Sequence, residues 1–196
     1  MTAVARSAPR HGAATVAWLL GGLAVASLAR AALNGHVVLS AFAAGATFGI
    51  VLIVMAAVVG WRPGRPSVSS LLVGSVGGLV LIVLPHLAHP LLPAVIGMRP
   101  EPFAAWILVT IIVVTGEEAL VRGALFGALE GAAGPIAAVA VTSLAFALMH
   151  VPLYGWQVVP LDLGVGVWLG GLRLATGGVA APAMAHGVAD LSTWWV

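Results

Sequence analysis

The second half of the chain contains two glutamates, two histidines, an aspartate and an arginine that together could support acid–base chemistry. They are Glu117, Glu118, Arg122, His150, His186 and Asp190. Carboxylates and imidazoles serve as general bases, as zinc ligands and as members of proton relays. All six lie inside or at the end of long apolar runs, where a charged group costs roughly 2.5–3.5 kcal/mol on insertion scales. Charges at such positions predict a functional site.

The spacing of these residues pairs them within helices. Glu118 and Arg122 are four residues apart, which on a helix places an acid and a base on the same face as an ion pair. His186 and Asp190 have the same spacing, so the carboxylate can bind the imidazole N–H and set its tautomer.

Depth along the helices predicts that the three groups meet. At 1.5 Å per residue, Glu117 lies about 20 Å from the inner end of its run, near Glu130. By the same measure His150 lies about 22 Å from Pro135, and His186 about 20 Å from Arg173. We therefore expect three separate helices to bring a glutamate and two histidines to one level of the bilayer.

The composition requires a membrane around this site. The chain has 196 residues, of which 61% are hydrophobic and 7% are charged, and its mean hydropathy is +1.13. Soluble domains carry about 25% charged residues, so this chain cannot cover a globule with polar surface. We predict an all-α, polytopic membrane helical bundle of about seven transmembrane helices, each of roughly 20 residues.

Turn-forming residues divide the chain into seven apolar runs and three predicted regions. The first run could be a cleaved signal peptide, because Ser27-Leu28-Ala29 imitates a cleavage site, but its length favours an uncleaved anchor. The expected runs are 13–33, 37–61, 68–84, 103–130, 135–150, 160–175 and a last one that follows Gly178 and ends at Trp194-Trp195. The predicted regions are a cytoplasmic tail (1–12), N-terminal transmembrane helices (13–102) and a C-terminal helical core (103–196) that holds the six residues.

The arginines predict an orientation. An inside N-terminus places most of them on the cytoplasmic side, as the positive-inside rule requires: Arg6, Arg10, Arg62, Arg65 and Arg173. Arg30, near the outer end of the first run, is expected to snorkel to the interface. The chain has no basic stripe, so we expect no nucleic-acid partner. Its eight arginines without a lysine are typical of a GC-rich bacterial genome, which predicts a multi-pass protein of a bacterial cell membrane.

At the six residues, the chain resembles the CAAX-protease and bacteriocin-processing (CPBP) family of intramembrane proteases, which contains the prenyl-protein endopeptidases. The family motifs are E-E-x-x-x-R, F-x-x-x-H and H-x-x-x-N or H-x-x-x-D. Here they read Glu117 to Arg122, Phe146 to His150 and His186 to Asp190, in this order and on separate runs. The resemblance covers about Phe103 to Val196 and implies a CPBP-type protease core in that half.

The resemblance implies hydrolysis of a peptide bond by water. It makes Glu117 the base that activates the water, which His150 holds, while Arg122 keeps Glu118 ionised and oriented. His186 and residue 190 would polarise the scissile carbonyl and stabilise the oxyanion. Asp190 departs from the more familiar Asn, because an ionised carboxylate accepts hydrogen bonds and cannot donate one to an oxyanion. It could instead orient His186 or stay protonated.

The metal dependence stays open at the level of sequence. We expect no tightly held metal, and the alternative is a zinc ion held by Glu117, His150 and His186, with the other glutamate as the base.

Three functions are compatible with the pattern. The first is an intramembrane endopeptidase whose partners are membrane lipid and a membrane-anchored peptide or protein. The alternatives are a non-catalytic bacteriocin-immunity or membrane-scaffold protein, and a proton-coupled transporter.

Overall fold

Every regular element that the structure describes is a helix. The computed structural model describes residues 12–34, 38–87 and 102–195. The predicted tail 1–12, apart from Gly12, and most of the connection between the third and fourth runs lie outside the described residues. The first three helices are α1 (Ala13–Leu33), α2 (Val38–Val58) and α3 (Val68–Leu87), close to the predicted runs.

The fourth predicted run forms one long rod with an irregular middle. It consists of α4 (Phe103–Glu118), a π-helical segment (Ala119–Leu125) and α5 (Phe126–Ala133). It is followed by α6 (Pro135–Tyr154), a 3-10 turn (Trp156–Val158), α7 (Val159–Thr176) and α8 (Ala180–Ser192). The all-α prediction is therefore confirmed.

The helices have the length and apolarity of a membrane bundle. Five described segments are long and apolar enough to cross a bilayer: Ala13–Leu33, Ser40–Val58, Phe103–Ala133, Pro135–Tyr154 and Trp156–Thr176. The apolar stretch of α3, Val68–Val83, is shorter, and α8 has only 13 residues. Large apolar side chains such as Val25, Val54 and Ile136 point outward, as expected for a surface in contact with lipid. The chain is a multi-pass membrane protein.

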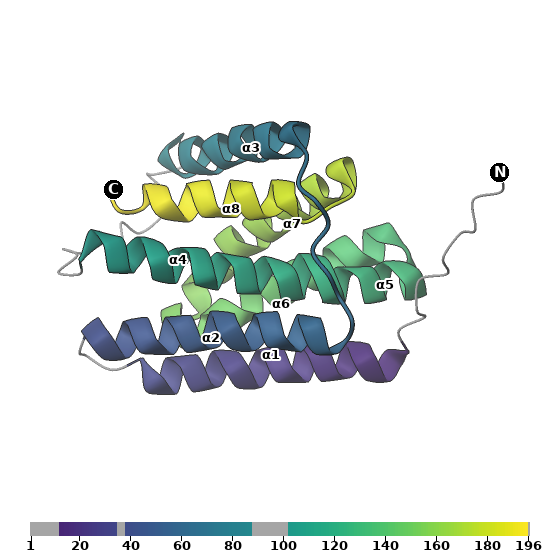
Figure 1. Cartoon of the computed structure of the whole chain (residues 1–196), viewed down its shortest axis with the longest axis horizontal. Coiled ribbons are helices and arrows are strands. Elements are labelled where there is room, and N and C mark those ends of the chain that lie inside the picture. Colours follow the sequence, from purple (N-terminus) through teal and green to yellow (C-terminus); the bar gives the residue numbers. More distant parts are fainter. Residues whose placement is uncertain (1–11, 35–37, 88–101, 196) are drawn as a thin grey trace.

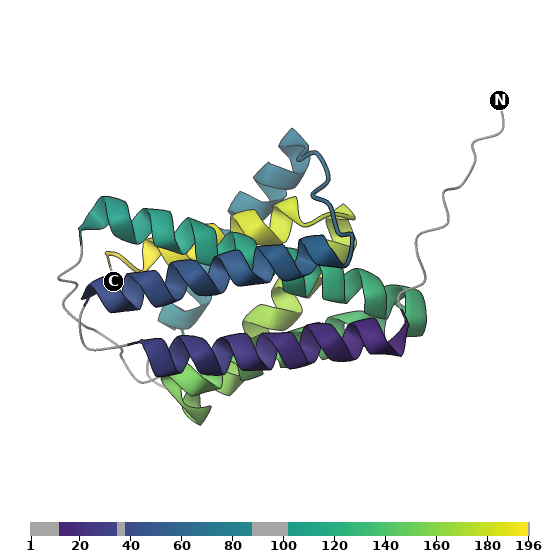
Figure 2. The same ribbon diagram turned by 60° about the horizontal axis from the view of Figure 1, so that its bottom comes forward.

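The helices pack in neighbouring pairs along the long axis of the molecule (Figure 1). The main pairs are α3 with α8, α6 with α7, α2 with α4 and α1 with α2. Figure 2 shows α1 and α2 side by side at the front, with α8 partly hidden behind α2. The N-terminal helices thus cover the rod that carries the glutamate pair, although they precede it by many residues.

Two glycines bring α2 and α4 into backbone contact beside the glutamates. A Cβ atom at Gly116 would lie 2.8 Å from the Cα of Gly49, and a Cβ at Gly49 would lie 2.6 Å from the carbonyl oxygen of Ile112. On α7, Gly166 and Gly170 meet Ser143 and Val139 of α6 in the same way. Glycine at such crossings lets helix backbones approach closely. Gly127 and Gly131, by contrast, face open space and make no helix contact.

The end of α6 differs from the sequence-based expectation. We predicted that the run from residue 135 ends at residue 150, but the helix continues through Pro152 to Tyr154 and is capped by Gly155, which has a φ of 83°. Proline inside a helix removes one hydrogen bond without always ending the helix, and glycine adopts the positive φ that a stop requires. His150 is therefore held within a continuous helix.

Replacing Gly116 by alanine should separate α2 from α4 and displace Glu117. The added methyl group meets backbone atoms that cannot rotate away, so we expect a loss of about 1–3 kcal/mol in the free energy of unfolding. Gly127→Ala is the matched control, because its Cβ meets nothing within 4 Å. Alanine there should be neutral or stabilising by up to about 1 kcal/mol. Thermal unfolding in detergent measures both, and equal melting temperatures for the two variants would contradict the close contact.

Candidate active site

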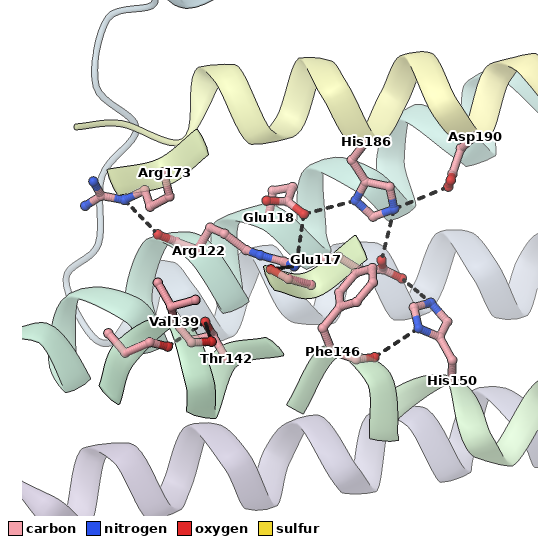
Figure 3. Close-up of polar contacts among 12 residues, drawn as sticks. Glu117, Glu118, Arg122, Val139, Thr142, Phe146, His150, Arg173, His186 and Asp190 are labelled. Carbon is pink, nitrogen blue, oxygen red and sulfur yellow. Dashed lines mark hydrogen bonds and ion pairs between the residues drawn. The ribbon is translucent and has the colours of Figure 1, made fainter. Parts of the chain in front are cut away.

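The most deeply buried polar contact is the ion pair between Glu118 and Arg122. Both side chains are 0% exposed, and Arg122 Nη1 donates to Glu118 Oε1 across 3.0 Å (Figure 3). Arg122 Nη2 also donates to the carbonyl oxygen of Gly166 on α7, at 3.4 Å. The pairing predicted from the four-residue spacing is present. Because an arginine stays charged in proteins, it provides Glu118 with a permanent counter-ion.

The ion pair holds His186 of α8. Nδ1 of His186 lies 3.0 Å from the same Oε1 of Glu118. An ionised carboxylate only accepts hydrogen bonds, so this ring nitrogen is the donor. The contact sets which edge of the imidazole faces the neighbouring Glu117. Glu118 therefore acts as a link between Arg122 on its own rod and the histidine of the last helix.

Glu117 lies between the two imidazoles. Its Oε1 is 4.0 Å from Nε2 of His150, and its Oε2 is 3.8 Å from Nε2 of His186. These separations are too long for direct hydrogen bonds, and polar gaps of this size are where a bridging water is expected. The three helices that we predicted to converge, α4, α6 and α8, do bring these groups together (Figure 3).

Arg30 is a site neighbour that the sequence reasoning missed. Its Nη1 lies 3.6 Å from Oε1 of Glu117, and its side chain is only 17% exposed. The guanidinium also lies over the ring of Phe48, with its carbon 4.8 Å from the ring centroid. We expected Arg30 to snorkel to the interface, but α1 packs so that this arginine turns inward. The sequence signal available was the arginine itself, the one charge in the run 13–33.

Asp162 is a second group that we did not predict. Nδ1 of His150 lies 3.0 Å from the carbonyl oxygen of Phe146 and 3.2 Å from Oδ2 of Asp162. Both neighbours are acceptors, so Nδ1 carries the hydrogen and Nε2, which faces Glu117, has a free lone pair. Its position in the first turn of α7, which packs against α6, brings it to His150.

The π-helical segment follows directly on Glu118 and contains Arg122. The N–H of Phe126 bonds to the carbonyl of Val121, five residues earlier, and the carbonyl of Arg122 accepts a hydrogen bond from Nε of Arg173 at 3.1 Å. Arg173 also lies over the ring of Phe126 at 5.0 Å. It is a helix-end arginine, as expected, but it ties α7 to the irregular rod. Such segments within α-helices are frequent at functional sites.

Phe146 forms the wall between the charged groups. The Arg122 guanidinium carbon lies 4.3 Å from its ring centroid. The imidazoles of His150 and His186 meet the same ring edge-on, at centroid distances of 4.9 and 5.4 Å. The aromatic residue of the F-x-x-x-H motif thus sets the separation of the two histidines.

Asp190 lies at the open side of the cluster. Its Oδ2 is 3.5 Å from Nε2 of His186, and its side chain is 43% exposed, whereas that of His186 is 5% exposed. The four-residue pairing within α8 is therefore present. Through this contact Asp190 borders the ring nitrogen that also faces Glu117.

A cavity reaches Glu118 from the loop that precedes α3. Its volume is about 570 Å³, and it is lined by Glu118 and Thr115 together with Arg65 and Ser67 of that loop. Among the described atoms, Oε2 of Glu118 has no hydrogen-bond partner. The cavity is large enough to hold several water molecules, which is how buried polar atoms of this kind are commonly satisfied.

The zinc alternative was tested against the donor positions. Glu117, His150 and His186 could supply one oxygen and two nitrogens, a common catalytic zinc set. In residues 12–34, 38–87 and 102–195, however, no group of three or more His, Cys, Asp or Glu side chains is arranged to hold a metal ion. The donors as placed do not fit a metal, so the mechanism below is built from side chains and water. That the protein holds no metal stays a prediction.

The fold and the cluster define a multi-pass membrane protein with a buried group of glutamates and histidines, and sequence comparison gives its family resemblance. Residues 99–192 match the family model described as type II CAAX prenyl endopeptidase Rce1-like. The predicted resemblance to CPBP-type proteases is thereby confirmed, over a segment that is slightly less than half of the chain and contains all three motifs. No significant match was found among curated proteins or among solved structures.

Removing Arg122 alone should destabilise the bundle strongly. Arg122→Met leaves the carboxylate of Glu118 buried without its counter-ion, and breaking a buried pair in this way costs about 3–5 kcal/mol. The double variant Glu118→Gln/Arg122→Met removes both charges and should regain most of that stability. Unfolding in detergent followed by circular dichroism measures the difference. A double variant no more stable than Arg122→Met would show that the ion pair does not account for the stability.

Proposed function

We propose that the protein is an intramembrane endopeptidase that cleaves membrane-associated peptides or proteins with a water activated by Glu117. The observation that carries the proposal is the position of Glu117, a buried carboxylate flanked by two imidazoles in a membrane bundle. The family resemblance supports the reaction class, because the matched family model is that of a CAAX prenyl endopeptidase.

The proposed attacking water lies between Glu117 and His150. His150 has its Nδ1 hydrogen directed at the Phe146 carbonyl, so its Nε2 can accept one hydrogen of the water while Oε1 of Glu117 accepts the other. A water held by two acceptors has a lone pair directed away from both, toward the substrate carbonyl. Orientation of this kind lowers the barrier by converting a collision into a positioned encounter.

The reaction also requires the transfer of one proton from the attacking water to the leaving nitrogen. Glu117 takes a proton as the water oxygen forms a bond to the carbonyl carbon, and the carbonyl π electrons move to the oxygen. When the tetrahedral intermediate collapses, the C–N bond breaks and Glu117 gives the proton to the leaving nitrogen. The same carboxylate thus acts as base and as acid. His186, placed by Glu118, would polarise the carbonyl through Nε2 as an imidazolium, in which both ring nitrogens carry a hydrogen.

We propose that the remaining groups support these three. Glu118 and Arg122 orient His186, Asp162 positions His150, and Asp190 contacts His186 from the open side. We infer a cytoplasmic N-terminus from the arginine distribution, with the helices up to residue 102 enclosing a catalytic core from 103 to 196. Substrates would be anchored in the bilayer, because the site lies at a depth that a soluble peptide does not reach.

Glu117→Gln should abolish turnover without unfolding the protein. Loss of the general base is expected to lower kcat by roughly 10²–10⁴-fold. The probes are two internally quenched peptides in proteoliposomes, one ending in a farnesylated cysteine and three residues and one with a plain transmembrane anchor. Glu130→Gln is the matched control, since Glu130 is an exposed glutamate on α5 of the same rod. Wild-type turnover in Glu117→Gln would remove Glu117 from the mechanism.

Asp162→Ala should lower kcat while leaving KM and the melting temperature nearly unchanged. The imidazole of His150 would keep its contact with the Phe146 carbonyl but lose one of two acceptors, and misplacement of a catalytic group by about 1 Å can cost about 10²-fold in rate. We expect a loss of roughly 10–100-fold on this ground. Steady-state kinetics against Glu130→Ala measures it, and an unchanged kcat would show that Asp162 does not position His150.

A further inference from the structure

The proposed site is short of hydrogen-bond donors for an oxyanion. Stabilising a tetrahedral intermediate takes N–H or O–H groups aimed at the oxygen on which charge develops. His150 directs its Nδ1 hydrogen at a backbone carbonyl, and His186 directs its Nδ1 hydrogen at Glu118. An ionised Asp190 only accepts, although it occupies a motif position where an Asn would donate. Among these three residues, Nε2 of His186 is the remaining candidate donor, and it already faces the carboxylates of both Glu117 and Asp190.

Arg30 places a guanidinium beside the carboxylate of Glu117. Its Nη1 contacts Oε1 of Glu117, the oxygen that also faces His150, whereas His186 faces Oε2. A guanidinium carries five N–H groups in a planar fork, so an ion pair with one carboxylate oxygen does not use all of them. In the described residues, Glu117 is the carboxylate with which Arg30 pairs.

There is space beside this guanidinium for a substrate. Arg30 lines a cavity of about 390 Å³ between α1 and α2, whose other lining residues include Ala29, Phe48 and Val51. The walls are mostly apolar, so a hydrogen bond made there is little weakened by competing water. Arg30 lines this cavity and also contacts Glu117, so it connects the cavity with the candidate active site.

We propose that Arg30 donates a hydrogen bond to the scissile carbonyl oxygen and takes the place of the donor that Asp190 cannot supply. As the water oxygen bonds to the carbonyl carbon, the π electron pair moves to the carbonyl oxygen, which the guanidinium N–H stabilises. The pair returns when the C–N bond breaks, and Arg30 keeps its protons throughout. Arg30 lies on α1, outside the segment that resembles the endopeptidase family. The inference rests on the proposed endopeptidase activity and names one further catalytic group for it.

A purely electrostatic role makes a different prediction. If Arg30 served only to balance the charge of Glu117, then removing any nearby negative charge would compensate for its loss. If Arg30 is the donor, only a replacement that brings a new N–H group should compensate. The residue at 190 allows both cases to be tested, because Asn and Leu are each neutral and similar in size, but only Asn donates.

The experiment compares Arg30→Met alone with Arg30→Met/Asp190→Asn and Arg30→Met/Asp190→Leu, using the quenched peptides in proteoliposomes. Loss of one oxyanion donor should lower kcat of Arg30→Met by roughly 10²–10³-fold, with KM little changed. The Asn double variant should recover about tenfold or more of that loss, since coupled residues are not additive, and the Leu double variant should not. Arg62→Met, at an exposed arginine in the loop before α3 that does not line either cavity, is the matched control and should behave as wild type.

Guanidinium rescue separates loss of the donor from loss of the fold. Adding guanidinium ion to Arg30→Ala should restore part of the turnover, which an unfolded protein cannot regain. Equal recovery by Asn and Leu, or wild-type kcat in Arg30→Met, would overturn the donor role while leaving the endopeptidase intact. A wild-type protein that cleaves neither peptide and releases no membrane peptide in cells would instead overturn the proposed function, and this inference with it.

Discussion

Pairing of charges in a medium that does not solvate them is the constraint on which this structure depends. Glu118 and Arg122 are completely buried, and a buried charge without a partner costs several kcal/mol. The pair holds much of the surrounding structure in place: Glu118 fixes His186, and Arg122 packs on Phe146, which contacts both imidazoles. The π-helical segment that carries Arg122 is in turn tied to α7 by Arg173. Displacing one of these groups would leave another uncompensated.

The two adjacent glutamates have different surroundings because they point to different sides of one helix. Glu118 has Arg122 and His186 as direct partners at 3.0 Å, whereas the neighbours of Glu117 lie at 3.6–4.0 Å. A carboxylate with tight partners is suited to hold other groups in place, and one with looser neighbours has room for a water and a substrate. Adjacent residues on a helix face directions about 100° apart, which is why one dipeptide can serve both purposes.

The N-terminal helices contribute more than a membrane anchor. Gly49 of α2 meets Gly116 directly before the glutamate pair, and Arg30 of α1 reaches Glu117. The segment that resembles the endopeptidase family therefore depends on residues outside it for both its packing and its charge balance. The presence of an acid at position 190 adds one negative charge to the cluster, and Arg30 adds one positive charge. The site is best understood as a product of both halves of the chain.

The lengths of the apolar runs were enough to predict the helices and the common depth of the three motifs. The four-residue spacings predicted the Glu118–Arg122 and His186–Asp190 pairs. Both succeed because helix rise and periodicity are local properties of the chain. They could not predict that α6 continues through Pro152. Proline removes one backbone hydrogen bond, but packing by neighbouring helices can stabilise the helix despite that loss. Nor could they predict the π-helical segment or the inward turn of Arg30 and Asp162. Those outcomes depend on which face each helix presents to its neighbours, and that is decided by packing between segments far apart in the chain. Sequence thus determined which charges the membrane must accommodate, and tertiary structure decided which partner each of them has.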